Sequence, residues 1–401
     1  MELSESETLK SNRIVKSRRD KHLPVFNAGL GANPFPPHEY LVETLKKHSH
    51  NKDYTSPSGI DDLKQSLIKK YSTKNYIAEN VIVGNGLKEL LYILQLTLKE
   101  DYTLFIITPA WVSYLEQAKI LNMDYNLIKT FSSRNYKVTS FDLDAALSRT
   151  DKKKVILFNN PTNPTGAIYY KEELEDLAKI FKRHRALVIS DEIYMKSIYP
   201  DKIHMTDSLS NYYPNVIIGS SLSKEFATGG WRLGWLIFNK ELNDIYNRVF
   251  NLCSSIYSCS SQPLQLLAVD AFKYPEELKK YINNNNIFFS RLGSYCYGRF
   301  NEMDLITSKP FAAWYIFLDF SNYKKKLNKV GINTSTELVE KLIDELGLVT
   351  VSGKSFGYDY LTLRYSFVDI VDAGKDIPFT DKISNIKLGI DKLEKWLTKL
   401  Y

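Results

Sequence analysis

The chain has 401 residues, enough for a large hydrophobic core and a second, smaller domain. Its formal net charge is +7, but 46 acidic residues interleave with 53 lysines and arginines, which favours a solvated surface over a nucleic-acid interface. No apolar run reaches membrane-spanning length, and the three cysteines have neither metal-ligand spacing nor a paired framework. We therefore expect a cytoplasmic protein that binds no membrane, nucleic acid or metal.

The N-terminal segment, residues 1–57, is predicted to be an arm that belongs to the smaller domain. Acidic and basic residues are mixed in its first twenty positions, and no apolar signal core is present. Because transit peptides avoid acidic residues, a targeting segment is not expected. We interpret this polar N-terminal segment as a helix that packs against a partner subunit.

The central segment, residues 58–280, alternates strand-like and helix-like patterns, which predicts βαβ units and a mainly parallel sheet. The helix expected over 171–183 places Leu174, Leu177 and Phe181 on one face. A long polar helix follows Pro275 and reaches to about residue 300.

The last segment, residues 281–401, is predicted to form a second, smaller sheet with flanking helices. Residues 312–318 are expected to be a strand, and residues 334–346 a helix. Residues 349–351 precede a loop over 352–357. The final helix is expected to take Ser384 as its N-cap.

Polar residues follow several of the predicted central strands. The turn around Gly86 lies between the strand-like 81–83 and a helix over 87–98, so it is either a phosphate cradle or an ordinary β–α turn. Asn163 lies in a rigid Pro- and Gly-containing turn after 155–158, and Asp191 ends the apolar run 186–190. Because ligands sit at the carboxyl ends of strands in open α/β sheets, these side chains are candidates for one site.

Lys224 follows another apolar run, 216–219, and lies among hydroxyls and glycines. Burial lowers the pKa of a lysine and makes its amine a nucleophile or base. Ser221 and Ser223 before it and Arg232 after it offer the donors and fixed charge that suit a phosphate. The alternative is that this segment is an ordinary strand and loop, in which Lys224 and Arg232 are exposed to solvent and have no role in a site.

Four motifs occur in the order and at the intervals of one known family: Asn-Pro-Thr-Asn-Pro-Thr-Gly (160–166), Asp-Glu-Ile-Tyr (191–194), Ser-Leu-Ser-Lys (221–224) and Gly-Trp-Arg-Leu-Gly (230–234). From about residue 27 to its end, the chain resembles the class I/II aminotransferases, which are aspartate aminotransferase-like enzymes of fold type I dependent on pyridoxal 5'-phosphate (PLP). The resemblance implies an α/β fold. Its large domain has a mainly parallel mixed sheet between helices, and a smaller α+β domain accompanies it.

The resemblance also implies the catalytic residues. Lys224 would form the Schiff base with the cofactor aldehyde and act as general base. Asp191 would pair with the protonated pyridine nitrogen, and Asn163 and Tyr194 would hydrogen-bond the phenolic oxygen of the ring.

The cofactor's phosphate and ring have further implied partners in the same family pattern. The phosphate would be held by backbone and side-chain groups of Gly86, Leu87, Lys88, Ser221, Ser223 and Arg232. Trp111 would stack on the pyridine ring, although a tryptophan after a strand is more often part of a core. Tyr54 matches a tyrosine that reaches the phosphate of a neighbouring subunit, which implies a homodimer.

Substrate contacts are implied at three positions. Arg364 would hold the α-carboxylate with its planar fork, unless it is an exposed strand arginine in a surface ion pair. Asn163 would also contact substrate. Gly29 and Gly31 both match the glycine of the family's substrate strip, and we favour Gly31.

The expected activity is transfer of an amino group between an L-amino acid and a 2-oxo acid. A PLP-dependent lyase or cyclase is the alternative, and a non-catalytic PLP-binding protein is a weaker one. The chain departs from the family pattern at Thr228 and at the doubled glycine Gly229-Gly230, which leaves the subfamily and the substrate open.

Overall fold

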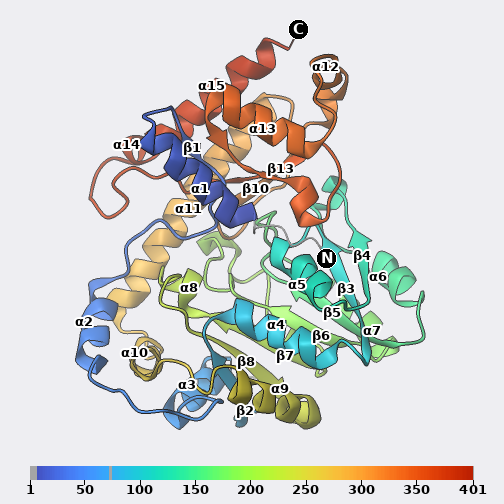
Figure 1. The fold of residues 1–401 in the computed structure, drawn as a ribbon, viewed down its shortest axis with the longest axis vertical. Coiled ribbons are helices and arrows are strands. Elements are labelled where there is room, and N and C mark those ends of the chain that lie inside the picture. The colour runs from blue at the N-terminus through green and yellow to red at the C-terminus, as the bar shows by residue number, and fades with distance from the viewer. Residues whose placement is uncertain (1–6, 72–74, 401) are drawn as a thin grey trace.

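The computed structural model describes residues 7–71 and 75–400, and a large and a small sheet organise them (Figure 1). Seven strands of the described chain form the large sheet in the order β2-β8-β7-β6-β5-β3-β4. Only β8 runs antiparallel to its neighbours, which confirms the predicted mainly parallel mixed sheet. The strand bounds are β2 Tyr76–Gly84, β3 Tyr102–Thr108, β4 Tyr125–Lys129, β5 Lys153–Asn159, β6 Leu187–Asp191, β7 Val216–Ser221 and β8 Gly234–Asn239.

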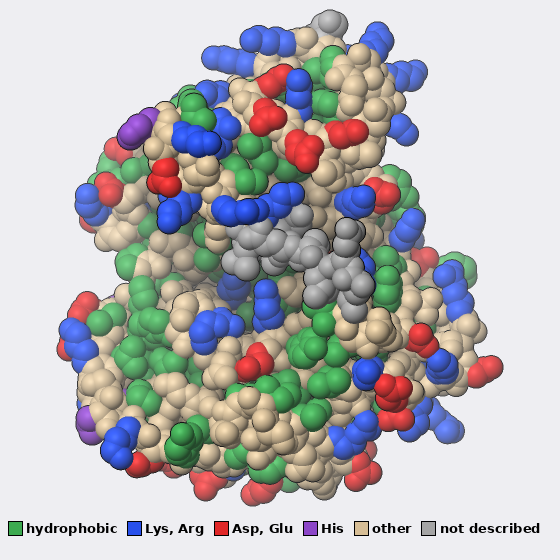
Figure 2. Space-filling view, in the orientation of Figure 1, with side chains coloured by type: hydrophobic (Ala, Val, Ile, Leu, Met, Phe, Trp, Pro, Cys, Tyr) green, Lys and Arg blue, Asp and Glu red, His purple; other side chains and the backbone are tan. Residues whose placement is uncertain are grey.

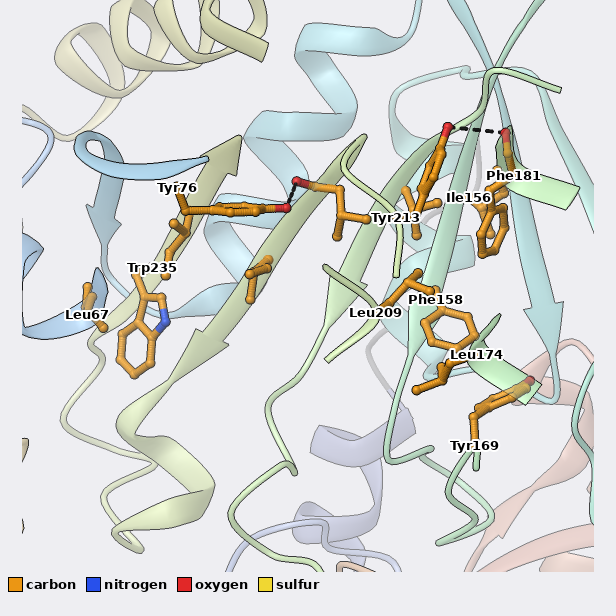
Figure 3. Packing of buried hydrophobic residues seen from close by; sticks show 14 of the residues in the cluster. Leu67, Tyr76, Ile156, Phe158, Tyr169, Leu174, Phe181, Leu209, Tyr213 and Trp235 are labelled. Atoms are coloured by element: carbon orange, nitrogen blue, oxygen red, sulfur yellow. Dashed lines mark hydrogen bonds between the residues drawn. The ribbon is translucent and has the colours of Figure 1, made fainter. Parts of the chain in front are cut away.

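Helices cover both faces of the large sheet, because successive residues of its buried strands face opposite sides. In β5, Leu157 packs in the cluster that contains α4, α5 and α9, while Phe158 packs in the cluster that contains α3, α6, α7 and α10. Figure 3 shows part of the second cluster, in which Phe158 lies near Leu174 of α7. The helix bounds are α3 Asp61–Tyr71, α4 Leu87–Leu98, α5 Val112–Ile120, α6 Ser140–Leu147, α7 Lys171–Arg183, α8 Leu222–Glu225, α9 Asn243–Ile256 and α10 Gln262–Ala271.

The smaller sheet is antiparallel and has the order β12-β13-β10-β9. Its strands are β9 Ile306–Thr307, β10 Tyr315–Asp319, β12 Val351–Ser352 and β13 Thr362–Ser366. A separate parallel pair joins the N-terminal β1 (Phe26–Asn27) to β11 (Leu348–Val349), which ties the arm to this half of the molecule. The remaining helices are α1 Glu7–Asp20, α2 Glu39–His48, α11 Glu276–Glu302, α12 Lys324–Lys329, α13 Ser335–Leu346, α14 Phe379–Lys382 and α15 Ser384–Thr398.

Helix α11 connects the two halves, and Figure 1 shows it running from the large sheet toward the small one. Its later residues Phe289, Leu292 and Phe300 pack in the core of the smaller half. The helix crosses the predicted boundary between residues 280 and 281 without a break. No break in the chain marks the predicted boundary, so the domain limits 1–57, 58–280 and 281–401 stay a prediction.

Two local expectations were wrong. The predicted strand over 312–318 begins only at Tyr315, because the preceding backbone bonds to loops of the larger half: the N–H of Ala312 donates to Gly166 and that of Ala313 to Ser197. Ser384 is not an N-cap but the first residue of α15. Its hydroxyl donates instead to the Asp381 carbonyl (2.8 Å), because α14 runs almost directly into α15.

Candidate active site

The carboxyl ends of three adjacent strands bring the predicted residues to one edge of the large sheet. Asn159 ends β5 and pairs in register with Asp191, which ends β6. Ser221 ends the next strand, β7, and α8 with Lys224 follows at once. Parallel strands explain the convergence, since their carboxyl ends lie at the same edge.

Asp191 is buried at 4% exposure and has two donors. The Tyr114 hydroxyl donates to Oδ2 (2.6 Å), and the backbone N–H of Ile193 donates to Oδ1 (3.1 Å). Burial raises the pKa of Asp191 to about 6, although these two bonds and the charge of Lys224 act in the opposite direction. Sequence reasoning missed Tyr114; its position three residues after Trp111, at the start of α5, was the available signal.

Lys224 is half-buried, and its amine donates to the backbone carbonyl of Gly31 in the N-terminal strip. Burial lowers its pKa to about 7, and the positive charge of Arg364 lowers it further, while Asp191 opposes the shift. The shift raises the neutral fraction of the amine near physiological pH, and the neutral amine is the form that acts as a nucleophile or base.

The residues predicted to hold phosphate meet at the start of α4. Gly86 is the N-cap of this helix at φ 102°, and a Cβ there would lie 2.2 Å from Nη2 of Arg232. Arg232 itself adopts φ 63° and donates from Nη1 to the Gly229 carbonyl (2.9 Å). The Ser221 hydroxyl accepts from the backbone N–H of Ser223 (3.2 Å), which places both serines beside Lys224.

Trp111 is the N-cap residue of α5; it is half-buried and packs against two hydrophobic clusters. The Lys88 ammonium lies 5.0 Å from the centroid of its ring, and Tyr114 meets it edge-on at 5.3 Å. Lys88 also lies on the wall of a cavity of about 1300 Å³ between α1, α5 and α13, which no other predicted site residue lines. Figure 2 shows lysine and arginine side chains gathered where the two halves of the molecule meet.

Arg364 lies on β13 and is buried at 2% exposure, so it is not the exposed strand arginine of the alternative interpretation. Its Nη1 donates to Oδ1 of Asn163 (3.1 Å), and its Nη2 donates to the Gly29 carbonyl (2.6 Å). Nε has no hydrogen-bond partner within the described part of the chain. Because leaving a buried donor unpaired is costly, this Nε–H is open to a ligand or an ordered water.

Tyr194 lies beside a second tyrosine that sequence reasoning missed. Its hydroxyl is 2.7 Å from that of Tyr315, and the Tyr315 hydroxyl donates to the Gly31 carbonyl (3.0 Å). A Cβ at Gly31 would lie 2.7 Å from the Tyr315 hydroxyl oxygen, so a glycine is needed at this position. Gly29 thus contacts Arg364, while Gly31 contacts Lys224 and Tyr315; our preference for Gly31 as substrate glycine stays a prediction.

Tyr54 is the one predicted site residue that stands apart. Its side chain is 90% exposed on the loop between α2 and α3, so it projects into solvent instead of joining the other residues of its own chain. This position leaves the predicted role across a subunit boundary open.

Comparison with known proteins identifies the family. The profile described as aminotransferase class I and II matches residues 24–371, most of the chain. The chain belongs to the class I and II aminotransferases. It is 31% identical over 375 residues to an aspartate aminotransferase of Bacillus sp. (strain YM-2), across 91% of this chain and 92% of that protein. It is 30% identical over 403 residues to the aspartate aminotransferase of Bacillus subtilis, across 97% of each.

Solved structures show the same fold. Aspartate aminotransferase from Thermus thermophilus with maleate superposes with a TM-score of 0.83 at 22% identity, covering 98% of this chain and 97% of that one. The Thermotoga maritima enzyme gives 0.82 at 24% identity, covering 99% and 98%. This class I and II aminotransferase therefore has fold type I and uses PLP to transfer amino groups.

The residues of the site fit that cofactor chemically. Buried hydroxyls at Ser221 and Ser223, the Arg232 guanidinium and the first N–H groups of α4 form a donor set for phosphate. Asp191 offers a carboxylate for a pyridinium, and Lys224 an amine that readily loses its proton. Two further findings concern only residues 7–71 and 75–400: no helix is long and apolar enough to cross a bilayer, and no cluster of histidine, cysteine or acidic residues could hold a metal.

Proposed function

We propose that this aminotransferase acts on aspartate or a similar acidic amino acid, with Lys224 as the lysine that binds PLP. Support for the residue roles comes chiefly from one juxtaposition: the Lys224 amine donates to the Gly31 carbonyl, which also accepts from the Tyr315 hydroxyl beside Tyr194. Burial lowers the pKa of the same amine, and the charges of Arg364 and Asp191 both act on it. Support for the acidic substrate comes from the relatives named aspartate aminotransferase.

Each side chain has a distinct task in this proposal. When bound, PLP supplies an electron sink for the bonds of the substrate Cα. Asp191 keeps the cofactor's ring nitrogen protonated by ion pairing. Arg364 orients the substrate through its α-carboxylate, and Lys224, once its amine is free, removes and returns the Cα proton.

The distal carboxylate of an acidic substrate needs a further cation. The cations that act on Lys224 are Arg364, Arg232 and Lys88. With Arg364 assigned to the α-carboxylate and Arg232 to the phosphate, Lys88 remains. Its ammonium lies over the Trp111 ring, and it makes no ion pair with an acidic residue in the described chain. We assign it to the distal carboxylate, in addition to the predicted role of its backbone N–H.

A half-reaction screen tests the proposal. The PLP-loaded protein is mixed with single amino acids, and the loss of its visible absorption is followed together with release of the 2-oxo acid. Aspartate should react best, and Lys88→Gln should raise KM for aspartate while leaving KM for alanine nearly unchanged. One relative is named for asparagine, so a preference for asparagine over aspartate would refute the acidic assignment. Ammonia with pyruvate, or a ring-closed product, would indicate a lyase or cyclase.

The assembly is the last part of the proposal. We propose a homodimer in which Tyr54 of each subunit reaches the phosphate of the other site. The support is its exposure of 90% on a chain whose own Lys224 it does not contact. The other support is the match of Tyr54 and Gly59 to the family's Tyr-x-x-x-x-Gly turn, and tyrosine is enriched at protein interfaces.

A further inference from the structure

A buried carboxylate follows Lys224 directly in the chain. Glu225 is the last residue of α8, and only 4% of its side chain is exposed. While the Lys224 amine reaches the N-terminal strip, the Glu225 carboxylate bonds to Lys70 and Tyr274, neither of which is a predicted site residue. The proposed roles of the site residues do not explain why Glu225 is buried or why it binds these partners.

Both oxygens of Glu225 are engaged. Lys70 Nζ lies 2.6 Å from Oε2, and the Tyr274 hydroxyl donates to Oε1. The Lys70 ammonium is enclosed by aromatic rings, with centroids at 4.5 Å (Phe272), 5.5 Å (Trp235) and 5.7 Å (Tyr274). Burial lowers the pKa of Lys70, and Glu225 opposes that shift. Removing one member would leave the other as an uncompensated buried charge.

The partners of Glu225 come from elements that frame the large half. Lys70 lies near the end of α3. Tyr274 precedes Pro275, the N-cap residue of α11, which continues to the core of the small half. The cluster of Lys70, Glu225 and Tyr274 therefore ties the helix that carries Lys224 to the start of the helix that connects both halves.

Helix α8 has little structure of its own and is held by tertiary contacts: Leu222 at its start and Phe226 after its end are buried in the core, and Glu225 lies between them. The helix has four residues, too few for a helix to be stable without tertiary contacts. The following loop contains Gly229 and Gly230, and a Cβ at Gly230 would meet no atom within 4 Å. The Thr228 hydroxyl donates back to the Leu222 carbonyl of α8 (3.1 Å), and its own carbonyl accepts from the N–H of Trp231 within the same loop (2.9 Å). Loop packing at the doubled glycine thus contributes little to holding the helix in place.

We propose that Glu225 is a positioning residue for Lys224. Its carboxylate, fixed by Lys70 and Tyr274, holds α8 in one orientation, so that the Lys224 amine stays directed at the substrate Cα. This inference rests on the proposed role of Lys224 as the lysine that binds PLP.

The test compares PLP-loaded wild type with Glu225→Gln and Tyr274→Phe. Because small misplacements of a catalytic group are costly, kcat for aspartate should fall about ten- to a hundredfold in Glu225→Gln, and less in Tyr274→Phe, which keeps the ion pair. KM should change little, and the pH midpoint of the bound cofactor's visible absorption should shift. Asp391→Asn is the matched control: it removes a partner of Arg299 (2.9 Å) in the small half and should alter thermal stability alone.

The outcomes distinguish failure of the positioning role of Glu225 from failure of the proposed role of Lys224. If Glu225→Gln and Tyr274→Phe melt earlier but keep the kcat and absorption of wild type, the cluster serves stability only and the inference is wrong. Should Glu225→Gln fail to fold, Tyr274→Phe alone decides by the same criteria. Failure of the proposed function is recognised differently, because Lys224→Ala would then retain the covalent visible band of wild type.

Discussion

At the scale of single residues, burial shifts the protonation equilibria of the two residues to which our proposal assigns the chemistry. It lowers the pKa of Lys224 to about 7 and raises that of Asp191 to about 6. Each shift favours the neutral form, and each charge partly restores the other, because the two groups interact across the site. The pKa of an amine near neutrality matches the need for a general base at physiological pH.

The first prediction concerns the rate at which the PLP-free protein captures PLP covalently. Only the neutral amine is nucleophilic, so the rate should rise with pH and reach its midpoint near pH 7 rather than near 10.5. Stopped-flow absorbance measures this rate, and Lys224→Ala provides the blank. A midpoint near 10.5 would show that Lys224 is solvated like a surface lysine.

The second prediction concerns Tyr114, whose hydroxyl donates to Asp191 at 2.6 Å. This bond lowers the pKa of Asp191, so Tyr114→Phe should raise it, by about one unit for a hydrogen bond to a charged group. The acidic limb of the kcat/KM profile should move to higher pH by that amount. An unchanged limb would remove Tyr114 from the support of Asp191.

At the scale of elements, the site depends on a close approach of backbone to guanidinium at the start of α4. Gly86 has φ 102°, which disfavours any side chain, and the space of its Cβ belongs to Arg232. Two features therefore favour glycine at position 86: its positive φ, and the close contact of Arg232 with the place that a Cβ would occupy.

The third prediction separates these reasons. Gly86→Ala should weaken PLP binding by about tenfold or more, because it displaces Arg232 and strains the N-terminus of α4. Gly331→Ala is the matched control: Gly331 has φ 82°, but a Cβ there meets nothing within 4 Å, so it introduces strain alone. Equilibrium titration with PLP measures both, and equal affinities in the two variants would contradict the contact with Arg232.

Regular elements and strand-end residues could be predicted from the sequence, while contacts between distant segments could not. Continuous apolar runs indicated the buried strands of the large sheet, and the spacing of apolar residues matched α7 over 171–183. Tyr114 was missed although its position three residues after Trp111 was a local signal, and Tyr315 was missed because a tyrosine on a strand gives no local signal of what it will meet. Glu225 was missed for the same reason, since its partners lie 155 and 49 residues away. The strand predicted over 312–318 began three residues too early, because the backbone before Tyr315 bonds to another part of the molecule.

At the scale of the whole molecule, the residues of the proposed site come from both halves and from the N-terminal arm. Asp191 ends a strand of the large sheet, Lys224 lies on α8 directly after the next strand, Arg364 belongs to the small sheet and Gly31 to the arm. Their relative positions therefore depend on the packing of the two halves and on α11, which connects them. The exposed Tyr54 extends this dependence to a second copy of the chain in our proposal.

The fourth prediction tests the cross-subunit role. Tyr54→Phe should weaken PLP binding by about tenfold, because a hydrogen bond to phosphate is lost. Mixing Tyr54→Phe with Lys224→Ala should restore wild-type affinity at one site of each hybrid dimer, where an intact Lys224 meets an intact Tyr54 from the partner. A monomer by light scattering, or no recovery on mixing, would contradict the proposal.

The central claim is that the amine of Lys224 bonds covalently to PLP opposite Asp191. Borohydride reduction of the PLP-loaded protein, followed by peptide mass mapping, tests it most directly, because reduction makes the linkage permanent. The account predicts a single phosphopyridoxyl group, on the peptide that contains Lys224 and on no other. A label on another lysine, or an unlabelled Lys224 in a protein that still transfers amino groups, would contradict it.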